Sequence, residues 1–316
     1  MTIESASQDL VAEFRSRRTL RAGSLITTVF GDSIAPRGGT VWLGSLITAM
    51  QGFGINERLV RTSVFRLVQD GWLQSTQIGR RSYYSLTDEG RERFEQATHK
   101  IYGKPAVSWD DTWCLVLLVD VDAVTKESVR KELGWLGFGA LSSNVLAHPT
   151  PDRSELDVTL RRLGVLHDVI VMSGSTVRNE PGMRKLVKES WNLDDIGKRY
   201  ANFVERFHPL VAAYGKDGNV APETAFLVRT LLIQEYRKVL LRDPQLPGEL
   251  LPTGWKGTAA YQLCRNLYLA IHAQADAYLS AILETADGPL PPPTSAFTQR
   301  FGGLDQGSLL DDQTDT

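Results

Sequence analysis

The chain has 316 residues, of which 42% are hydrophobic and 23% are charged, and its formal net charge is −2. This is ordinary globular composition, and the length favours two or three domains. Two cysteines are too few for a disulfide framework, no apolar run is long enough to cross a bilayer, and the polar N-terminus differs from a signal peptide. We therefore expect a cytoplasmic protein in which Cys114 and Cys264 are buried, reduced thiols.

The charges are distributed unevenly along the chain. Between Phe14 and Arg81 there are ten arginines, no lysine and three acidic residues, an excess of seven positive charges. From Glu284 to the C-terminus there are six acidic residues and one basic residue. This asymmetry favours a polyanionic partner for the N-terminal part of the chain.

Two short helices are predicted near residue 50. Residues 41–50, "VWLGSLITAM", predict the first helix, which the tight turn "QGFG" closes. Asn56 is a favourable N-cap for the second helix, whose apolar stripe faces a core. The stripe consists of Val60, Val64, Leu67 and Gly71. Two helices joined by a tight turn predict a helix-turn-helix.

A β-hairpin is predicted directly after this second helix. Residues 72–78, "WLQSTQI", and residues 81–86, "RSYYSL", alternate as strands around Gly79 and Arg80. A hairpin with a basic tip behind a helix-turn-helix is typical of a wing.

Polar residues outside the apolar stripe are the candidate DNA contacts. A helix fits the major groove, and the planar guanidinium of arginine binds guanine or phosphate through two donors. The candidates are Arg58, Arg61, Thr62 and Arg66 on the helix, and Arg80 and Arg81 on the wing. Two alternatives stay open: the arginines form a solvated, salt-bridged helix face, or the wing belongs to a non-enzymatic module that binds another protein.

The middle of the chain predicts a ferredoxin-like domain. Strand, helix, strand, strand, helix and strand patterns follow one another between residues 112 and 177 in the order β-α-β-β-α-β. Asp120 and Asp122 end the first strand on the same side, so a metal-dependent nuclease is an alternative. The other interpretation is that they cap the next helix or meet solvent. The five histidines lack zinc-site spacing, and we predict no metal, no cofactor and no enzyme activity.

The last third predicts helices up to residue 288, followed by a tail. Long amphipathic patterns cover residues 193–215, 222–243 and 257–286. After Pro289, the run "PLPPPTS" and the acidic composition predict a disordered and dispensable tail. The whole chain is thus predicted to be an α+β multidomain protein with an all-α C-terminal domain. Its predicted parts are a winged helix-turn-helix domain over 1–103, a ferredoxin-like domain over 104–178, a helical domain over 179–288 and the tail over 289–316.

Three long stretches resemble one known family. They are "SLITTVFGDSIAPRGGTVWLGSLITAMQGFGINERLVRTSVFRLVQDGWL", "GRRSYYSLTDEGRERF" and "FLVRTLLIQEYRKVLLRDPQLPGELLPTGWKGTAAYQLCRNLY". The chain resembles the PaaX family, the repressors of phenylacetic acid degradation operons. The resemblance implies a GntR-like winged helix, a ferredoxin-like middle domain and a helical C-terminal domain. It also implies a homodimer that binds double-stranded operator DNA and is released by phenylacetyl-coenzyme A.

An acyl-coenzyme A effector would need cations for its phosphates and an aromatic environment for its acyl group. We expect this site where the ferredoxin-like and helical blocks meet. The candidates are Arg178, Trp191, Arg199, Tyr200, Tyr236, Arg237, Arg242 and Trp255. The alternative is that the arginines form structural ion pairs and the tryptophans belong to the core.

Overall fold

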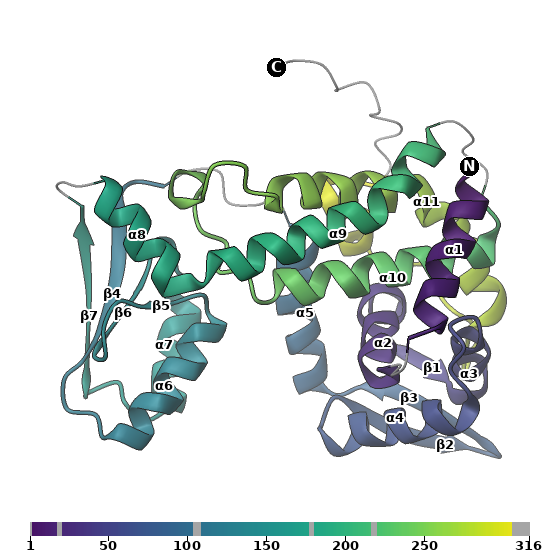
Figure 1. Cartoon of the computed structure of the whole chain (residues 1–316). Helices are drawn as coiled ribbons and strands as arrows, with labels where there is room; N and C mark the ends of the chain where they lie inside the picture. The colour runs from purple at the N-terminus through teal and green to yellow at the C-terminus, as the bar shows by residue number, and fades with distance from the viewer. Residues whose placement is uncertain (1, 18–20, 104–108, 177–179, 216–219, 305–316) are drawn as a thin grey trace. The chain divides into compact units, whose positions relative to one another are not determined.

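The structure is a computed structural model that describes residues 2–17, 21–103, 109–176, 180–215 and 220–304 (Figure 1). Two compact units divide the chain. The winged-helix unit is formed by residues 1–104, 203–237 and 259–316, and the ferredoxin-like unit by residues 105–202 and 238–258. The α+β multidomain fold class is confirmed. The domain boundaries at residues 103, 178 and 288 stay predictions.

The first unit contains the predicted winged helix-turn-helix. Its elements are α2 (Ala22–Val29), η1 (Phe30–Ile34), η2 (Ala35–Arg37), β1 (Thr40–Trp42), α3 (Leu43–Gln51), α4 (Glu57–Gln69), β2 (Leu73–Ile78) and β3 (Arg81–Leu86). The three strands pair antiparallel in the order β1-β3-β2. The hairpin of β2 and β3 is the wing, and it follows α4 directly (Figure 1).

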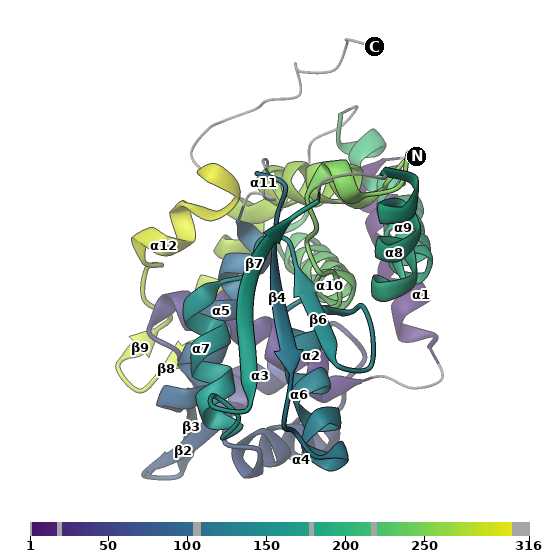
Figure 2. The ribbon, with the colours of Figure 1, turned by 90° about the vertical axis from the view of Figure 1, so that its left-hand side faces the viewer.

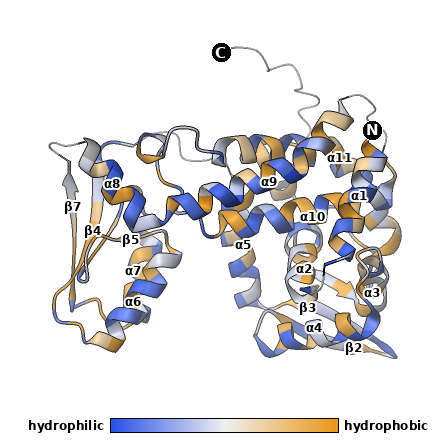
Figure 3. Cartoon of the chain, viewed as in Figure 1, coloured by the Kyte–Doolittle hydropathy of each residue, from blue (hydrophilic) through white to orange (hydrophobic). Residues whose placement is uncertain are grey.

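The turn between α3 and α4 is fixed by its own residues. Gly54 has a φ of +75°, which glycine adopts without strain. Phe53 and Ile55 on either side are buried, so the turn is anchored in the core. In α4, Val60 and Val64 are fully buried, as the apolar stripe predicts. Figure 3 shows hydrophilic and hydrophobic residues mixed along α4, as expected for an amphipathic helix.

Helices from both ends of the chain complete this unit. They are α1 (Ile3–Arg15), α5 (Asp88–Tyr102) and those parts of α9 (Leu193–Tyr214), α10 (Pro222–Leu240) and α11 (Gly257–Ile282) that belong to the unit. Phe53 packs edge to face against Phe14 of α1 and Phe226 of α10, with ring centroids 6.2 and 5.6 Å apart. The turn before α4 is therefore held by residues distant in sequence.

The second unit has the predicted ferredoxin-like topology. Its order is β4 (Thr112–Leu118), α6 (Ala123–Trp135), β5 (Gly139–Ala140), β6 (Val145–His148), α7 (Arg153–Arg162) and β7 (Val169–Ser175). The antiparallel sheet has the order β5-β6-β4-β7. α8 (Glu180–Trp191) and η3 (Gly248–Leu250) also belong to this unit.

The two faces of this sheet differ. Cys114, Val116 and Leu118 of β4 belong to a core with residues of α6 and α7. In Figure 2 the strands lie nearer the viewer than these two helices. On the opposite face, Ile170 and Met172 of β7 are 50% and 45% exposed. Part of this apolar face is therefore open within the chain.

The predicted disordered tail is wrong for residues 289–304. This segment begins with the last residue of the hairpin formed by β8 (Glu284–Thr285) and β9 (Gly288–Pro289), and it contains α12 (Ser295–Thr298) and η4 (Arg300–Gly302). Leu290, Phe297, Phe301 and Leu304 are buried. The prediction relied on the proline-rich and acidic composition of the whole tail. It therefore overlooked these four apolar side chains, whose burial stabilises the segment. Residues 305–316 lie outside the described residues.

A buried charge cluster joins the two ends of the winged-helix unit. The Asp32 carboxylate lies 3.0 Å from both Arg229 Nε and Arg300 Nη1, and it accepts hydrogen bonds from the Tyr102 and Tyr268 hydroxyls at 2.6 and 3.0 Å. All five side chains are buried. Through its contact with Asp32, Arg300 therefore connects the C-terminal segment to η1.

Both cysteines are buried free thiols, as predicted. Burial raises the pKa of Cys264 well above its ordinary value, so this thiol stays protonated at neutral pH. Among the described helices, none combines the length and apolar character needed to span a membrane.

Candidate nucleic-acid interface

The exposed face of α4 carries the four predicted contact residues. The Asn56 side chain caps the helix by accepting the Leu59 amide at 2.9 Å. With Val60 and Val64 turned into the core, the opposite face is left to solvent. Arg58, Arg61, Thr62 and Arg66 are all exposed there. A helix with one buried stripe and three arginines on its outer face has the form that enters a DNA groove.

The contacts of these residues within the chain are weak. Arg61 forms an ion pair with Glu57 at 2.7 Å, and both side chains are more than half exposed. Such an exposed pair is easily exchanged for a phosphate contact. Thr62 Oγ1 donates to the Arg58 carbonyl at 2.8 Å. In the described part of the chain, neither Arg58 nor Arg66 forms an ion pair.

Phe65 is a surface residue of α4 that the sequence reasoning missed. Its side chain is 62% exposed, although it is large and apolar. An exposed aromatic side chain beside arginines can contact the methyl group of thymine. The signal was available, because Phe65 lies off the apolar stripe of the helix.

The wing presents its two predicted arginines differently. The strands pair up to Ile78 and Arg81, and Gly79 at the tip has a φ of +60°. Arg80 is exposed at the tip. Arg81 forms an ion pair with Glu284 at 2.8 Å, and its guanidinium lies 4.1 Å from the ring centroid of Trp42. Arg81 must therefore give up an acidic partner before it can bind a phosphate.

Not all of the ten arginines contribute to this surface. Arg37 is buried and pairs with Asp276 at 2.9 Å. Arg17 pairs with Glu13 and Glu235. The charge excess counted along the sequence therefore overstates the positive charge that a ligand would meet.

The predicted effector residues fall in both units. Trp191, Arg199, Tyr200, Arg242 and Trp255 belong to the ferredoxin-like unit, Tyr236 and Arg237 to the winged-helix unit, and Arg178 lies outside the described residues.

In the ferredoxin-like unit, two of these residues are buried and bonded. Trp191 donates Nε1 to the Gly137 carbonyl at 2.7 Å, and the Tyr200 hydroxyl donates to Asp243 at 2.6 Å. These contacts are typical of core residues.

The remaining three lie closer to solvent. Arg199 Nε is 2.7 Å from Asp195 in an exposed ion pair, and Arg242 is also exposed. The hydrogen bond from Arg199 lowers the pKa of Asp195, desolvation opposes this effect, and the charges of Arg199, Arg242 and Lys198 lower the pKa further. Trp255 is half-buried, with its ring centroid 5.7 Å from that of Tyr200. Cations and an aromatic ring thus gather within one unit.

In the winged-helix unit, the Tyr236 ring is buried, and its centroid lies 5.4 Å from that of Phe203. Arg237 donates to Ser24 of α2 through Nη2, at 3.0 Å to the carbonyl oxygen and 3.1 Å to Oγ.

The two aspartates behind the nuclease alternative lie at the start of α6. Asp122 caps this helix by accepting the amides of Val124 and Thr125 at 2.9 and 3.1 Å. Asp122 therefore has the helix-capping role that the sequence analysis gave as the alternative to metal binding. Asp120 is exposed. Across the described ranges, no three His, Cys, Asp or Glu side chains gather as a metal site requires.

Comparisons with known proteins cover most of the chain. Residues 21–90 match the family model of the PaaX-like protein, residues 106–186 that of the PaaX protein central Cas2-like domain, and residues 191–281 that of the PaaX-like protein C-terminal domain. A curated relative, the transcriptional repressor PaaX of Escherichia coli (strain K12), is 42% identical over 284 residues, which are 89% of this chain and 90% of the relative. A solved structure, the uncharacterized protein Rv0674 from Mycobacterium tuberculosis, is 23% identical with a TM-score of 0.46, over 74% of this chain and 89% of its own.

Proposed function

The chain belongs to the PaaX-like family, and we propose that it is a DNA-binding transcriptional repressor of a phenylacetic acid catabolic operon rather than an enzyme. The observation that carries this proposal is the exposed face of α4, with three arginines directly beside a wing whose tip is basic. The family models and the Escherichia coli relative confirm the family resemblance inferred from the sequence.

In this proposal, α4 enters the major groove of the operator. Arg58, Arg61 and Arg66 reach guanine edges or phosphates, and Thr62 adds a hydroxyl. Arg80 at the wing tip contacts the neighbouring backbone. Arginine contacts to phosphate release counterions, so binding weakens as salt rises.

The test is an operator-binding titration with the double variant Arg58→Ala, Arg61→Ala. Each lost base contact is expected to cost about 1–3 kcal/mol of binding free energy. The control is Lys131→Ala, Arg161→Ala, which removes two exposed charges from the ferredoxin-like unit and leaves α4 intact. Operator binding at wild-type strength by a folded Arg58→Ala, Arg61→Ala protein would contradict the assignment of α4.

The same proposal includes release from DNA by phenylacetyl-coenzyme A or a related acyl-coenzyme A. Arg199, Arg242 and Trp255 are the predicted effector residues of the ferredoxin-like unit that are at least partly exposed, and they offer cations and an aromatic ring. Release requires that the effector bind the DNA-incompetent state more tightly, since equal affinity for both states shifts nothing.

A panel of acyl-coenzyme A thioesters, titrated into the protein–operator complex, tests this part. Phenylacetyl-coenzyme A is expected to release the DNA at the lowest concentration. Arg199→Ala, Arg242→Ala should raise the concentration needed and leave DNA binding without effector unchanged. Release at an unchanged concentration would exclude these two arginines.

We also propose that the repressor acts as a homodimer. One recognition helix reads only a few base pairs, and a two-fold dimer doubles the contact on a palindromic operator. The open part of the ferredoxin-like sheet supports a second copy as the partner. β7 is an edge strand of seven residues without a charge or proline to block pairing, and it exposes Ile170 and Met172.

Analytical ultracentrifugation tests the dimer. Ile170→Glu, Met172→Glu should convert it to monomers, whereas Val158→Glu should not, because the equally exposed Val158 lies on α7. A wild-type monomer at the concentration where operator binding saturates would overturn the proposal.

A further inference from the structure

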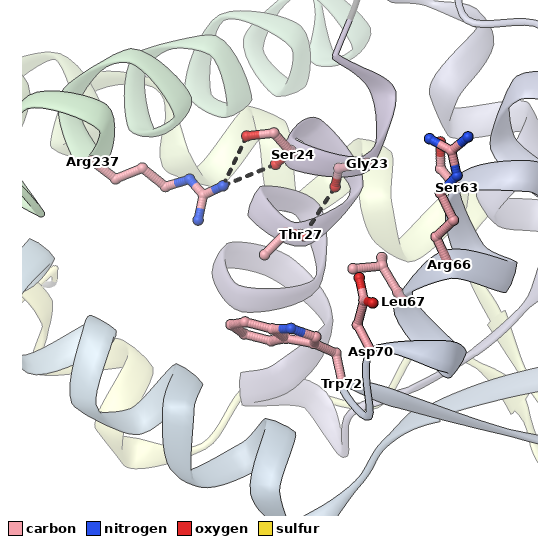
Figure 4. A pocket seen from close by; sticks show the side chains of 9 residues that line it. All are labelled: Gly23, Ser24, Thr27, Ser63, Arg66, Leu67, Asp70, Trp72 and Arg237. Carbon is pink, nitrogen blue, oxygen red and sulfur yellow. Dashed lines mark hydrogen bonds between the residues drawn. The ribbon is translucent and has the colours of Figure 1, made fainter. Parts of the chain in front are cut away.

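The winged-helix unit contains a pocket of about 390 Å³ beside α4 (Figure 4). Its volume lies within the ~300–1,000 Å³ range of small-molecule sites. α2, α4 and α10 provide most of the wall. The lining residues are Gly23, Ser24, Thr27, Ser63, Arg66, Leu67, Asp70, Trp72 and Arg237.

Arg237 carries a positive charge at this pocket. No carboxylate of the described residues forms an ion pair with it. Its guanidinium donates to uncharged groups within the described ranges, namely Ser24 and the Gln234 side-chain oxygen, which is 3.3 Å from Nε. Burial lowers the pKa of Arg237, because desolvation disfavours its charged form. An anion in the pocket would remove this penalty through charge-assisted hydrogen bonds.

The start of α2 adds a second attraction for an anion. Gly23 and Ser24 lie in the first turn, before the Leu25 amide makes the first helical bond, to the Arg21 carbonyl at 3.2 Å. First-turn amides have no partner within a helix, and the helix dipole makes this end positive. Arg66 lines the same pocket, and Asp70 is the single acidic residue of the lining.

The rest of the wall suits an uncharged, apolar part of a ligand. Trp72 is half-buried, and its ring packs edge to face on Phe94, with centroids 5.5 Å apart. Leu67 is half-buried beside it on α4. Figure 4 shows Arg237 and Trp72 entering the pocket region from different elements, with Ser24 and Thr27 of α2 between them.

We propose that this pocket binds a small organic molecule that presents a carboxylate or phosphate to Arg237 and the first turn of α2, and an apolar group to Trp72 and Leu67. Three of the nine lining residues, Ser63, Arg66 and Leu67, belong to α4, and Arg66 is also a proposed DNA contact. An occupant that engages Arg66 therefore lowers operator affinity; this consequence rests on the proposed function.

Isothermal titration calorimetry without DNA tests the pocket, so the result does not depend on operator binding. The probes are phenylacetate, inorganic pyrophosphate, coenzyme A and phenylacetyl-coenzyme A, which separate a carboxylate source from a phosphate source. Wild-type protein should bind at least one probe saturably. Arg237→Gln should weaken that binding about 10- to 100-fold, since a hydrogen bond to a charged group contributes roughly 1.5–3 kcal/mol.

A second pocket variant keeps the test decisive if Arg237→Gln fails to fold. Thr27→Leu keeps Arg237 but fills the pocket, and it removes only a hydrogen bond within α2, from Thr27 Oγ1 to the Gly23 carbonyl at 2.9 Å. It should abolish binding. Arg162→Gln, which removes an exposed arginine of the ferredoxin-like unit, should bind like the wild type. No saturable binding of any probe, or wild-type affinity in both pocket variants, would overturn the site.

The consequence for DNA is tested by repeating the titration with operator present. Linkage requires DNA to weaken probe binding by the same factor by which the probe weakens DNA binding. Equal probe affinities with and without operator would overturn the coupling.

Discussion

At the residue scale, Asp32 is the centre of the buried charge cluster. Burial alone would raise the pKa of Asp32, but the charges of Arg229 and Arg300 and the hydrogen bonds from Tyr102 and Tyr268 lower it below its ordinary value. A carboxyl group with a depressed folded pKa contributes stability above its unfolded pKa of about 3.9 and loses this contribution as the pH falls to the folded pKa. We therefore expect the free energy of unfolding to decrease below about pH 4.

Replacement of Asp32 by Asn should lower the free energy of unfolding at pH 7 by about 3–5 kcal/mol, because Arg229 and Arg300 would remain buried without their shared carboxylate. Chemical denaturation between pH 3 and pH 7 measures this, and the acid-dependent loss should be smaller in the variant. Asp195→Asn is the control: its ion pair with Arg199 is exposed and contributes little, so the denaturation midpoint should shift far less than in Asp32→Asn. Wild-type stability of Asp32→Asn would show that the cluster does not depend on its acid.

At the scale of elements, the wing carries two arginines: Arg80, which forms no ion pair with any described residue, and Arg81, which is already paired. In the proposed complex, Glu284 would compete with DNA for Arg81, and both side chains of this pair are nearly half exposed. Glu284→Gln should free Arg81, tighten operator binding a few-fold and steepen its salt dependence.

Arg80→Ala should reduce the slope of log affinity against log salt by about 0.9, the value for one phosphate contact.

Fluorescence anisotropy with labelled operator at several salt concentrations measures both effects. Glu89→Gln changes the net charge by the same amount, but Glu89 pairs with Arg93 on α5, so the operator affinity should stay at the wild-type value. Equal affinities of Glu284→Gln and Glu89→Gln would mean that the Arg81–Glu284 pair does not limit DNA binding.

At the scale of the whole molecule, the C-terminal segment belongs to the folded core. A chain ending at Gly288 lacks Phe297, Arg300 and Phe301, which are buried, and it leaves Asp32 with one cation fewer. Each buried phenylalanine contributes about 3–5 kcal/mol, so this truncation should lower the free energy of unfolding by more than about 5 kcal/mol.

Thermal and chemical unfolding of two truncated chains tests this. A chain ending at Leu304 keeps every residue named above and should be as stable as the full-length protein. A stable, operator-binding protein that ends at Gly288 would contradict the role assigned to the segment and restore the sequence-based expectation of a dispensable tail.

Local patterns were sufficient for the elements that form the candidate DNA interface. The Asn56 cap, the buried Val60 and Val64 and the hairpin around Gly79 depend on residues within a few positions of one another, so they can be read from spacing. The β-α-β-β-α-β order likewise follows from alternating periodicities, and the structure has that order.

By itself, the sequence determined the winged helix, the ferredoxin-like topology, the exposed face of α4 and, through its long specific stretches, the family. Only the tertiary structure decided which charges are free. Arg300 meets Asp32 across 268 positions, and Arg81 meets Glu284 across 203. The chain brings Arg237 to Ser24 across 213 positions. No local periodicity encodes such pairs, because they depend on how distant helices pack. A charge count along the chain therefore cannot distinguish an arginine that is paired within the fold from one that is accessible to a ligand.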